Sequence, residues 1–314
     1  MKKIVIFGGG SGLSQLLKGI MQFPWDVTAV VCMSDNGSST GRLREEFDIP
    51  AVGDITKVLM AMSTESKGVK DLFNYRFNGD SSIGNHTIRN LIMTALLDQH
   101  GDFAHSLPIL CDLLDVKGKI LPLTEDNVDL VGVTKEGYEI IGEEQITESK
   151  RKIVDLKYSK KVKATPKVIE AIKNADLIIF SSGSLLTSIL PNLIVPEIVE
   201  AIEKSKAKTM YVCNMLTQPG ETDNFKVSDH VKVLEKHLGK RKIDVVIANT
   251  AKIPKNMSLL VKSEGKDVVA IDDKKLEKMG TKVIAEKLFK VEDGYVRHDS
   301  LKTAYLMFSY LIGE

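Results

Sequence analysis

The first 33 residues leave this chain few folds to choose from, because an apolar run leads directly into a glycine loop. The run IVIF (4–7) predicts a strand, GGGSG (8–12) a loop, and leucines at helical spacing (13–20) a helix. A second apolar run, VTAVVCM (27–33), follows. This strand–loop–helix–strand order, in runs without alternation, is typical of a parallel sheet that is buried on both faces.

The rest of the chain divides into three stretches. From about 53 to 116, four runs with helical periodicity follow one another without a strand, which predicts a helical block. From about 119 to 160, short runs rich in Val and Ile, beginning with KILPLT, predict an antiparallel β-hairpin insertion. Helices and strands then alternate, with DVVAID (267–272) among the strands. We expect one domain over 1–314 with a doubly wound, mostly parallel α/β sheet.

Charge and cysteine content narrow the functional classes. The chain has 43 Lys+Arg against 42 Asp+Glu, a formal charge of +1, which speaks against a general nucleic-acid binder. No apolar run approaches the roughly 20 residues of a membrane helix, so no membrane span is expected. Three scattered cysteines favour reduced thiols, and we expect a cytoplasmic protein.

The first candidate for ligand binding is the glycine loop. Glycine permits positive φ and lets backbone N–H groups approach a phosphate, which a helix N-terminus also favours. The loop does not match the dinucleotide fingerprint G-x-G-x-x-G, because Leu13 stands at the last position. A tight turn without a ligand is the alternative. We predict a phosphate-binding loop made of Gly8, Gly9, Gly10, Ser11 and Gly12.

The second candidate is the loop SDNGSSTGRLREEF (34–47), which follows the second strand. It joins a carboxylate, an amide, hydroxyls and arginines, and arginine forks grip phosphate. Asn36, Ser38 and Arg42 are the predicted phosphate ligands, and Asp35 is predicted to hold a ribose hydroxyl or a divalent ion such as Mg²⁺. The alternative is a solvated loop with an Asx-turn and a helix cap.

Two later strands are followed by similar loops. SSGSLLTSILPN (181–192) contributes Gly183, Ser184 and Thr187, and it is not the G-x-S-x-G of a serine hydrolase. A second anion-binding turn is the prediction there.

The next loop, NMLTQPGETDN (214–224), contributes Asn214, Thr217 and Gln218, whose side chains suit a base or sugar edge. From composition alone, a structural loop without a ligand is an equal alternative.

Arg297 is the last candidate. It stands in YVRHDS, read as a turn before the final helix, which Asp299 or Ser300 can cap. The ligand hypothesis has Arg297 emerging near the other helix starts. The alternative is an ion pair with Glu292 or Asp293.

These loops, in this order and spacing, resemble the bacterial gluconeogenesis factor (YvcK-like) group of the 2-phospho-L-lactate transferase (CofD-like) superfamily, from end to end. The stretches that carry the resemblance are IVIFGGGSGLSQLLKGI, DNGSSTGRLREEF, GDI (53–55), GSLLTSILPNLIVPEI, NMLTQPGET and RHD (297–299). The resemblance implies a Rossmann-like three-layer sandwich. Its transferase branch moves 2-phospho-L-lactate from a nucleoside diphosphate carrier to a deazaflavin with a divalent ion.

Resemblance to the YvcK-like branch, for which no reaction is settled, implies a cytoplasmic protein that binds UDP-sugars such as UDP-N-acetylglucosamine. It would link carbon metabolism to cell-wall synthesis and cell shape, with protein partners in that synthesis. A homodimer is the prior for such folds. The sequence departs from the family at Asn36, where a second aspartate is common, at Thr56-Lys57, where Arg-Asn is usual, and at Arg89, where a glycine is usual.

Two functions therefore compete. The first is a nucleotide-sugar binding regulator without turnover, and we favour it because the phosphate loops match the family better than the metal residues do. The second is a Mg-dependent phospho-group transferase, in which Asp35 holds the ion and Arg42 neutralises charge. A simple oxidoreductase is disfavoured by the failed fingerprint.

Overall fold

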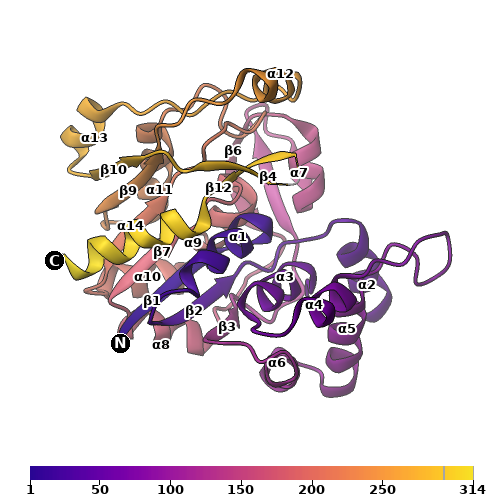
Figure 1. Ribbon diagram of the computed structural model, residues 1–314. Helices are drawn as coiled ribbons and strands as arrows, with labels where there is room; N and C mark the ends of the chain where they lie inside the picture. Colours follow the sequence, from indigo (N-terminus) through magenta and orange to yellow (C-terminus); the bar gives the residue numbers. More distant parts are fainter. Residues whose placement is uncertain (293, 314) are drawn as a thin grey trace.

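The computed structural model describes residues 1–292 and 294–313, so Asp293 lies outside the described residues. Its centre is a seven-stranded, all-parallel sheet with the order β10-β9-β8-β7-β1-β2-β3 (Figure 1). The strands are β1 (Lys2–Gly8), β2 (Trp25–Val31), β3 (Lys119–Pro122), β7 (Leu177–Phe180), β8 (Lys208–Val212), β9 (Val245–Asn249) and β10 (Lys282–Glu286).

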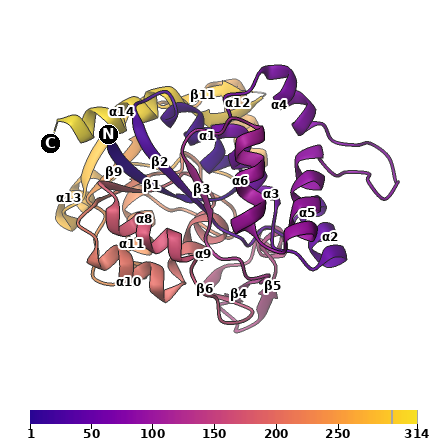
Figure 2. The ribbon, with the colours of Figure 1, turned by 90° about the horizontal axis from the view of Figure 1, so that it is seen from below.

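Helices cover both faces of this sheet, which makes the three layers (Figure 2). Successive strand residues face opposite ways, so Ile4 and Ile6 belong to one core, and Val5 and Phe7 to the other. One face carries α1 (Gly10–Ile20), α3 (Gly53–Met62) and α14 (Ser300–Ile312). The opposite face carries α8 (Pro166–Asn174), a π-helical turn at Leu185–Ile189, α9 (Leu190–Leu193), α10 (Pro196–Lys204), α11 (Val227–His237) and α13 (Asp273–Met279).

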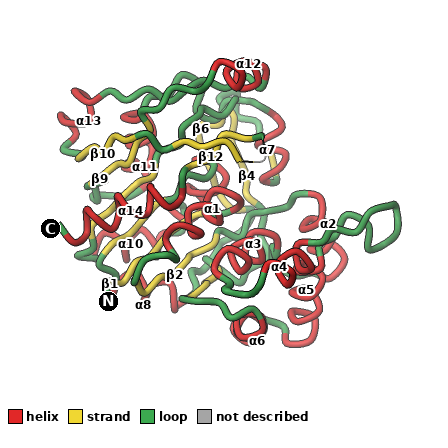
Figure 3. The backbone as a smooth tube through the Cα atoms, viewed as in Figure 1, coloured by secondary structure: helices red, strands yellow, loops and turns green. Residues whose placement is uncertain are grey.

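The predicted helical block is confirmed and lies beside the sheet (Figure 3). It contains α3, α4 (Lys67–Asn74), α5 (Ile88–His100) and α6 (Phe103–Leu113), with α2 (Ser38–Phe47) packed on α5. The side chains of Ser66, Thr87 and Asp102 each accept a hydrogen bond from the N–H three residues further on. These caps end the loops and fix where the helices begin.

The insertion differs from the prediction at its start and in its middle. KILP (119–122) is β3, which pairs parallel with β2 at the edge of the main sheet. The antiparallel sheet holds only β4 (Leu130–Thr134), β5 (Glu139–Ile141) and β6 (Ile153–Tyr158), and α7 (Glu143–Ser149) lies between the last two. The sequence of a four-residue apolar run does not indicate whether the neighbouring strand is parallel or antiparallel. For this reason β3 was predicted in the wrong sheet.

The C-terminal part also differs in detail. DVVAID, predicted as a strand, makes only an isolated bridge between Leu216 and Val268. A helix that the sequence analysis missed, α12 (Lys255–Ser263), precedes it. The run KVIAEKLFKV divides into β10 and β11 (Phe289–Glu292), and β11 forms an antiparallel hairpin with β12 (Tyr295–His298).

The sheet has one switch point, between β1 and β7. From β1 the chain proceeds outward through β2 to β3, and from β7 it proceeds the other way to β10. The loops after β1 and β7 therefore leave the same edge of the sheet in opposite directions and open a crevice there. In open α/β sheets this crevice is where ligands bind.

No single helix among the described residues is long and apolar enough to cross a membrane. Only Leu185–Leu193 and Pro196–Lys204, bent by 73° to each other, reach that length and apolar character together. Their large apolar side chains belong to the core. Cys32, Cys111 and Cys213 are all free thiols, and burial raises the pKa of the Cys32 thiol.

Candidate functional site

A polar cavity of about 450 Å³ opens at the switch point. The loops after β1, β2, β7 and β8 supply most of its wall, and the hairpin β11–β12 closes one side. Its lining residues include Gly9, Gly10, Ser11, Gly12, Gln15, Asp35, Asp54, Lys57, Glu143, Ser182, Gly183, Ser184, Ser188, Asn214, Met215, Leu216, Thr217, Gln218, Lys266, Val296, Arg297 and His298. Eleven of the sixteen residues predicted for the site are among them, drawn from five separate stretches of the chain. Their binding role stays a prediction.

Three predicted residues of the second loop do not line this cavity. Asn36 accepts from the N–H of Glu144 (2.9 Å) and donates to Gln145 Oε1 (2.7 Å), so it ties the loop to α7. Arg42 is exposed and donates to the carbonyl of Gly84. Ser38 is exposed at the start of α2. The stretch continues into a helix that carries these side chains away, which a loop prediction could not anticipate.

Two further predicted residues are buried beside the cavity. Gly8 is the last residue of β1, and a Cβ there would lie 2.1 Å from Ser181 Oγ, so the position requires glycine for packing. The Thr187 hydroxyl lies 2.9 Å from Glu143 Oε1 and 2.8 Å from Ser184 Oγ. Both residues support the wall from behind.

The two glycine loops touch each other. A Cβ on Gly12 would stand 2.7 Å from the Cα of Gly183, so the loops after β1 and β7 approach through bare backbone. Gly10 has φ +58°, a region that costs L-residues roughly 1 kcal/mol or more. Much of the glycine content of these loops is therefore explained by their own close contact and backbone conformation.

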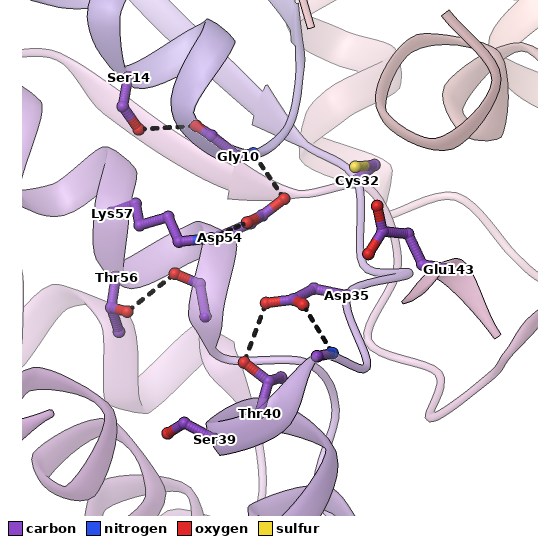
Figure 4. Close-up of polar contacts among 12 residues, drawn as sticks. Gly10, Ser14, Cys32, Asp35, Ser39, Thr40, Asp54, Thr56, Lys57 and Glu143 are labelled. Atoms are coloured by element: carbon purple, nitrogen blue, oxygen red, sulfur yellow. Dashed lines mark hydrogen bonds and ion pairs between the residues drawn. The ribbon is translucent and has the colours of Figure 1, made fainter. Parts of the chain in front are cut away.

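An aspartate occupies part of the predicted phosphate site. Asp54, in the first turn of α3, accepts the N–H of Gly10 at 2.5 Å and pairs with Lys57 Nζ at 2.9 Å (Figure 4). The hydrogen bonds of the described residues leave the N–H groups of Ser11 and Gly12 without an acceptor. The start of α1 therefore offers an anion two free donors rather than three.

Carboxyl groups dominate the electrostatics of this wall. Burial raises the pKa of Asp54, and neighbouring Asp35 raises it further against the opposing effect of Lys57. Burial alone would lower the pKa of Lys57, but Asp54 and Asp35 hold it above its ordinary value. Burial, with Asp35 second, raises the pKa of Glu143 to about 7. Near neutral pH, Glu143 is therefore half protonated.

Asp35 does not face a set of metal ligands. Its Oδ1 accepts from the N–H of Gly37 (3.0 Å) and its Oδ2 from Thr40 Oγ1 (2.9 Å). Nowhere in residues 1–292 and 294–313 do three His, Cys, Asp or Glu side chains converge in a way that suits a metal ion. The residues present do not fit the divalent ion that the family resemblance implies.

The loops after β7 and β8 hold their polar side chains in internal bonds. Ser184 Oγ caps the π-helical turn through Thr187 N–H (2.9 Å) and donates to half-buried Glu221 (2.7 Å). Asn214 donates to Gly183 O (2.9 Å) and accepts from Tyr211 (2.8 Å). These groups shape the cavity, and they would have to exchange partners in order to contact a ligand.

Thr217 and Gln218 differ in the same loop. Thr217 Oγ1 is buried and accepts from Asp267 N–H at 2.9 Å, so it is structural. Gln218 has only a 3.5 Å contact, with Asn214, from its side chain. Within the described chain, the amide of Gln218 therefore keeps most of its hydrogen-bonding capacity free at the cavity wall.

Arg297 lies in a strand rather than in the predicted turn. It stands in β12 opposite Lys290, and its guanidinium lies over the Tyr295 ring at 5.3 Å. No ion pair within the described residues joins it to Glu292, whose carboxylate accepts from Gln15 at 2.8 Å. Asp299 caps α14 through Lys302 N–H, as the sequence predicts.

His298, next to Arg297, lines the cavity although it was not among the predicted site residues. Burial lowers the pKa of its imidazole to about 4, so the ring is neutral. Neither ring nitrogen makes a hydrogen bond of normal geometry, although the Cys213 backbone lies close enough to oppose the shift. A buried imidazole with unmade hydrogen bonds therefore stands at the cavity wall.

The other missed residues come from elements far away in sequence. Asp54 and Lys57 belong to α3, Glu143 to the start of α7, and Lys266 follows α12. The stretch GDI (53–55) points to Asp54 only because it matches the family that the sequence resembles. Nothing local marks Glu143, because only the folding of the insertion back onto the sheet brings it to the cavity.

Sheet order, glycine loops and cavity together define the class: a doubly wound α/β protein with its candidate site at the switch point of a parallel sheet. The family model 2-phospho-L-lactate transferase CofD matches residues 4–289, and the chain belongs to this family.

Two relatives that are named gluconeogenesis factor match it along nearly their whole length. The one from Bacillus subtilis is 41% identical over 310 residues, 98% of each chain. The one from Halalkalibacterium halodurans is 37% identical, over 96% of this chain and 94% of its own. The crystal structure of a UPF0052-family protein from Bacillus halodurans superimposes with a TM-score of 0.94 at 36% identity, covering 98% of this chain and 99% of that one.

Proposed function

We propose that this chain binds a nucleoside-diphosphate-linked ligand of the UDP-sugar kind in the switch-point cavity and acts as a regulator. The observation that carries the proposal is the pair of free N–H donors of Ser11 and Gly12 at the start of α1, with the Gly183 loop in contact beside them. Bare backbone donors at a helix N-terminus suit a diphosphate.

Three side chains support the rest of such a ligand. Arg297 has no carboxylate partner within the described residues, and it lines the same cavity as the glycine loop, where it suits a sugar-phosphate group. Gln218 offers an amide edge to a sugar or base. Uncharged His298 can donate or accept one hydrogen bond.

The cellular role is proposed on the relatives' name, gluconeogenesis factor, and on what the family resemblance implies. This chain would act in the cytoplasm and couple carbon metabolism to cell-wall synthesis and cell shape. The same proposal includes a homodimer and protein partners in cell-wall synthesis. It does not include binding of nucleic acid.

Calorimetry on the full chain tests the binding proposal. UDP-N-acetylglucosamine, UDP-glucose, GDP and NAD are titrated in turn, each with and without Mg²⁺. We expect saturable heat with at least one UDP-sugar and none with NAD. Equal response to all four, or to none, would overturn the proposal.

A phospho-group transferase is the second candidate, and Glu143 is the observation that favours it. With a pKa of about 7 and its carboxyl at the cavity, Glu143 can give or take a proton near neutral pH. Incubation of the chain with a nucleoside-diphosphate-linked donor and candidate acceptors, followed by ³¹P NMR, separates the two candidates. New phosphodiester or released nucleotide supports transfer, and an unchanged donor supports binding alone.

A further inference from the structure

A second cavity, of about 480 Å³, lies behind the glycine loop and has a different character. It is formed between α1, α3, α4 and α5, and the hairpin β11–β12 borders it. We define the basic pocket by its five cationic side chains, Lys18, Lys57, Lys70, Arg89 and Arg297. Glu292 is the one acidic residue in its described lining.

The positive charge of this pocket is largely uncompensated. Within the described residues, only Lys57 among the five cations has a carboxylate partner, Asp54. Lys18 and Lys70 bond neutral oxygens, of Gln15 (3.1 Å) and Ser63 (2.7 Å). Glu292 is already engaged by Gln15 and by Lys290.

Arg89 is the strongest single indication of a missing anion. Its Nη1 donates to Asn74, but its Nε is buried with no hydrogen-bond partner. Burial, with Arg76 second, lowers the pKa of its guanidinium to about 10. Placing a desolvated cation beside other cations costs free energy, and a bound anion would offset that cost.

We propose that the basic pocket binds a small phosphate monoester next to the ligand of the switch-point cavity. The excess of cations suits a dianion, and the cavity is larger than phosphate alone, which leaves room for a short organic part. Ser11, Gln15, Lys57 and Arg297 line both cavities, so the two ligands would be neighbours. The proposal goes beyond the nucleotide site and does not depend on it.

The test measures anion binding to the full chain without nucleotide, in buffer of constant chloride concentration. The probes are inorganic phosphate and glycerol 3-phosphate, with glycerol as the uncharged control, followed by calorimetry. Arg89→Gln and Lys70→Gln should each weaken binding of glycerol 3-phosphate about tenfold or more. Lys206→Gln removes the same charge from an exposed lysine elsewhere and should leave binding unchanged.

Several results would overturn the proposal. One is an unchanged affinity of Arg89→Gln for glycerol 3-phosphate. Another is a loss of affinity in Lys206→Gln as large as in the pocket variants, which would mean that the anion is attracted by the surface charge in general. If Arg89→Gln fails to fold, Lys18→Gln on the exposed side of α1 replaces it, with the same expected loss.

UDP-sugar titrations of the same variants keep the two proposals apart. Arg89 and Lys70 line only the basic pocket, so their replacement should leave the nucleotide affinity as it is. Phosphate binding without any UDP-sugar binding would contradict the proposed function but would support a phosphate site in the basic pocket. Loss of both ligands together in folded Arg89→Gln would contradict a separate pocket.

Discussion

At the scale of single residues, protonation of carboxyl groups sets the charge of the switch-point cavity. Glu143 has a pKa of about 7 in the folded chain, against an ordinary value near 4.5, because it is buried close to Asp35. Sequence reasoning found the glycine loop, whose signal is local. It could not find Glu143, because 108 residues separate it from its electrostatic neighbour Asp35 (143 − 35).

Glu143→Gln should change how stability depends on pH. Between about 4.5 and 7 the folded chain holds a proton on Glu143 that the unfolded chain has lost, so this group lowers stability as pH rises. Glutamine removes that effect. We expect the melting temperature of the variant, relative to the parent, to be higher at pH 8 than at pH 5. A difference that is the same at both pH values would refute the assignment.

Arg297→Ala tests the proposed sugar-phosphate contact. A charge-assisted bond is worth about 1.5–3 kcal/mol, so UDP-sugar affinity should fall roughly 10- to 100-fold. Because Arg297 has no carboxylate partner in the described chain, the melting temperature should hardly move. Titration and thermal denaturation of the same sample check both statements. Unchanged affinity would remove Arg297 from the site.

At the scale of elements, α1 links the cavity to the C-terminal segment. Its first turn carries the glycine loop, and its far end packs on the start of α14 (Figure 1). The sequence predicted both helices from periodicity and the α14 cap from Asp299. It could not show that they touch, because a small residue at a helix crossing gives no periodic signal of its own.

Gly19→Ala should separate these two helices. A Cβ at Gly19 would lie 2.0 Å from the carbonyl oxygen of Ser300, and backbone atoms cannot give way cheaply. Overpacking of this kind costs about 1–3 kcal/mol, which thermal denaturation would register as a lower melting temperature.

Gly68→Ala in α4 is the matched control for Gly19→Ala. A Cβ there meets nothing within 4 Å, so the better helix propensity of alanine should raise stability by about 0.5–1 kcal/mol. Changes of the same sign in both variants would show that the α1–α14 contact is not what matters.

At the scale of the whole molecule, one sheet is shared by two cores. Each interior strand contributes to both, so neither core can lose its packing while the other keeps it. The doubly wound pattern was predictable because β-branched runs and helical periods alternate along the chain. The placement of β3 was not, because edge position depends on which neighbour a short strand finds.

Unfolding should therefore be a single transition. Trp25 is the one tryptophan, and it packs against Phe23 and Phe308, where β2 meets α14. Its fluorescence and the far-UV circular dichroism should change at the same urea concentration. Two separated midpoints would show that the chain contains units that unfold independently.

The bond between Asp54 and the Gly10 N–H places a carboxylate directly beside the two N–H donors that the proposed phosphate would use. The protein already presents an anion to its own helix N-terminus, so a second anion that binds there would meet electrostatic repulsion. Asp54 can relieve that repulsion by taking up a proton, and burial has already raised its pKa. Binding at this loop would then draw protons from the buffer, and the calorimetric heat would vary with the ionisation enthalpy of the buffer chosen.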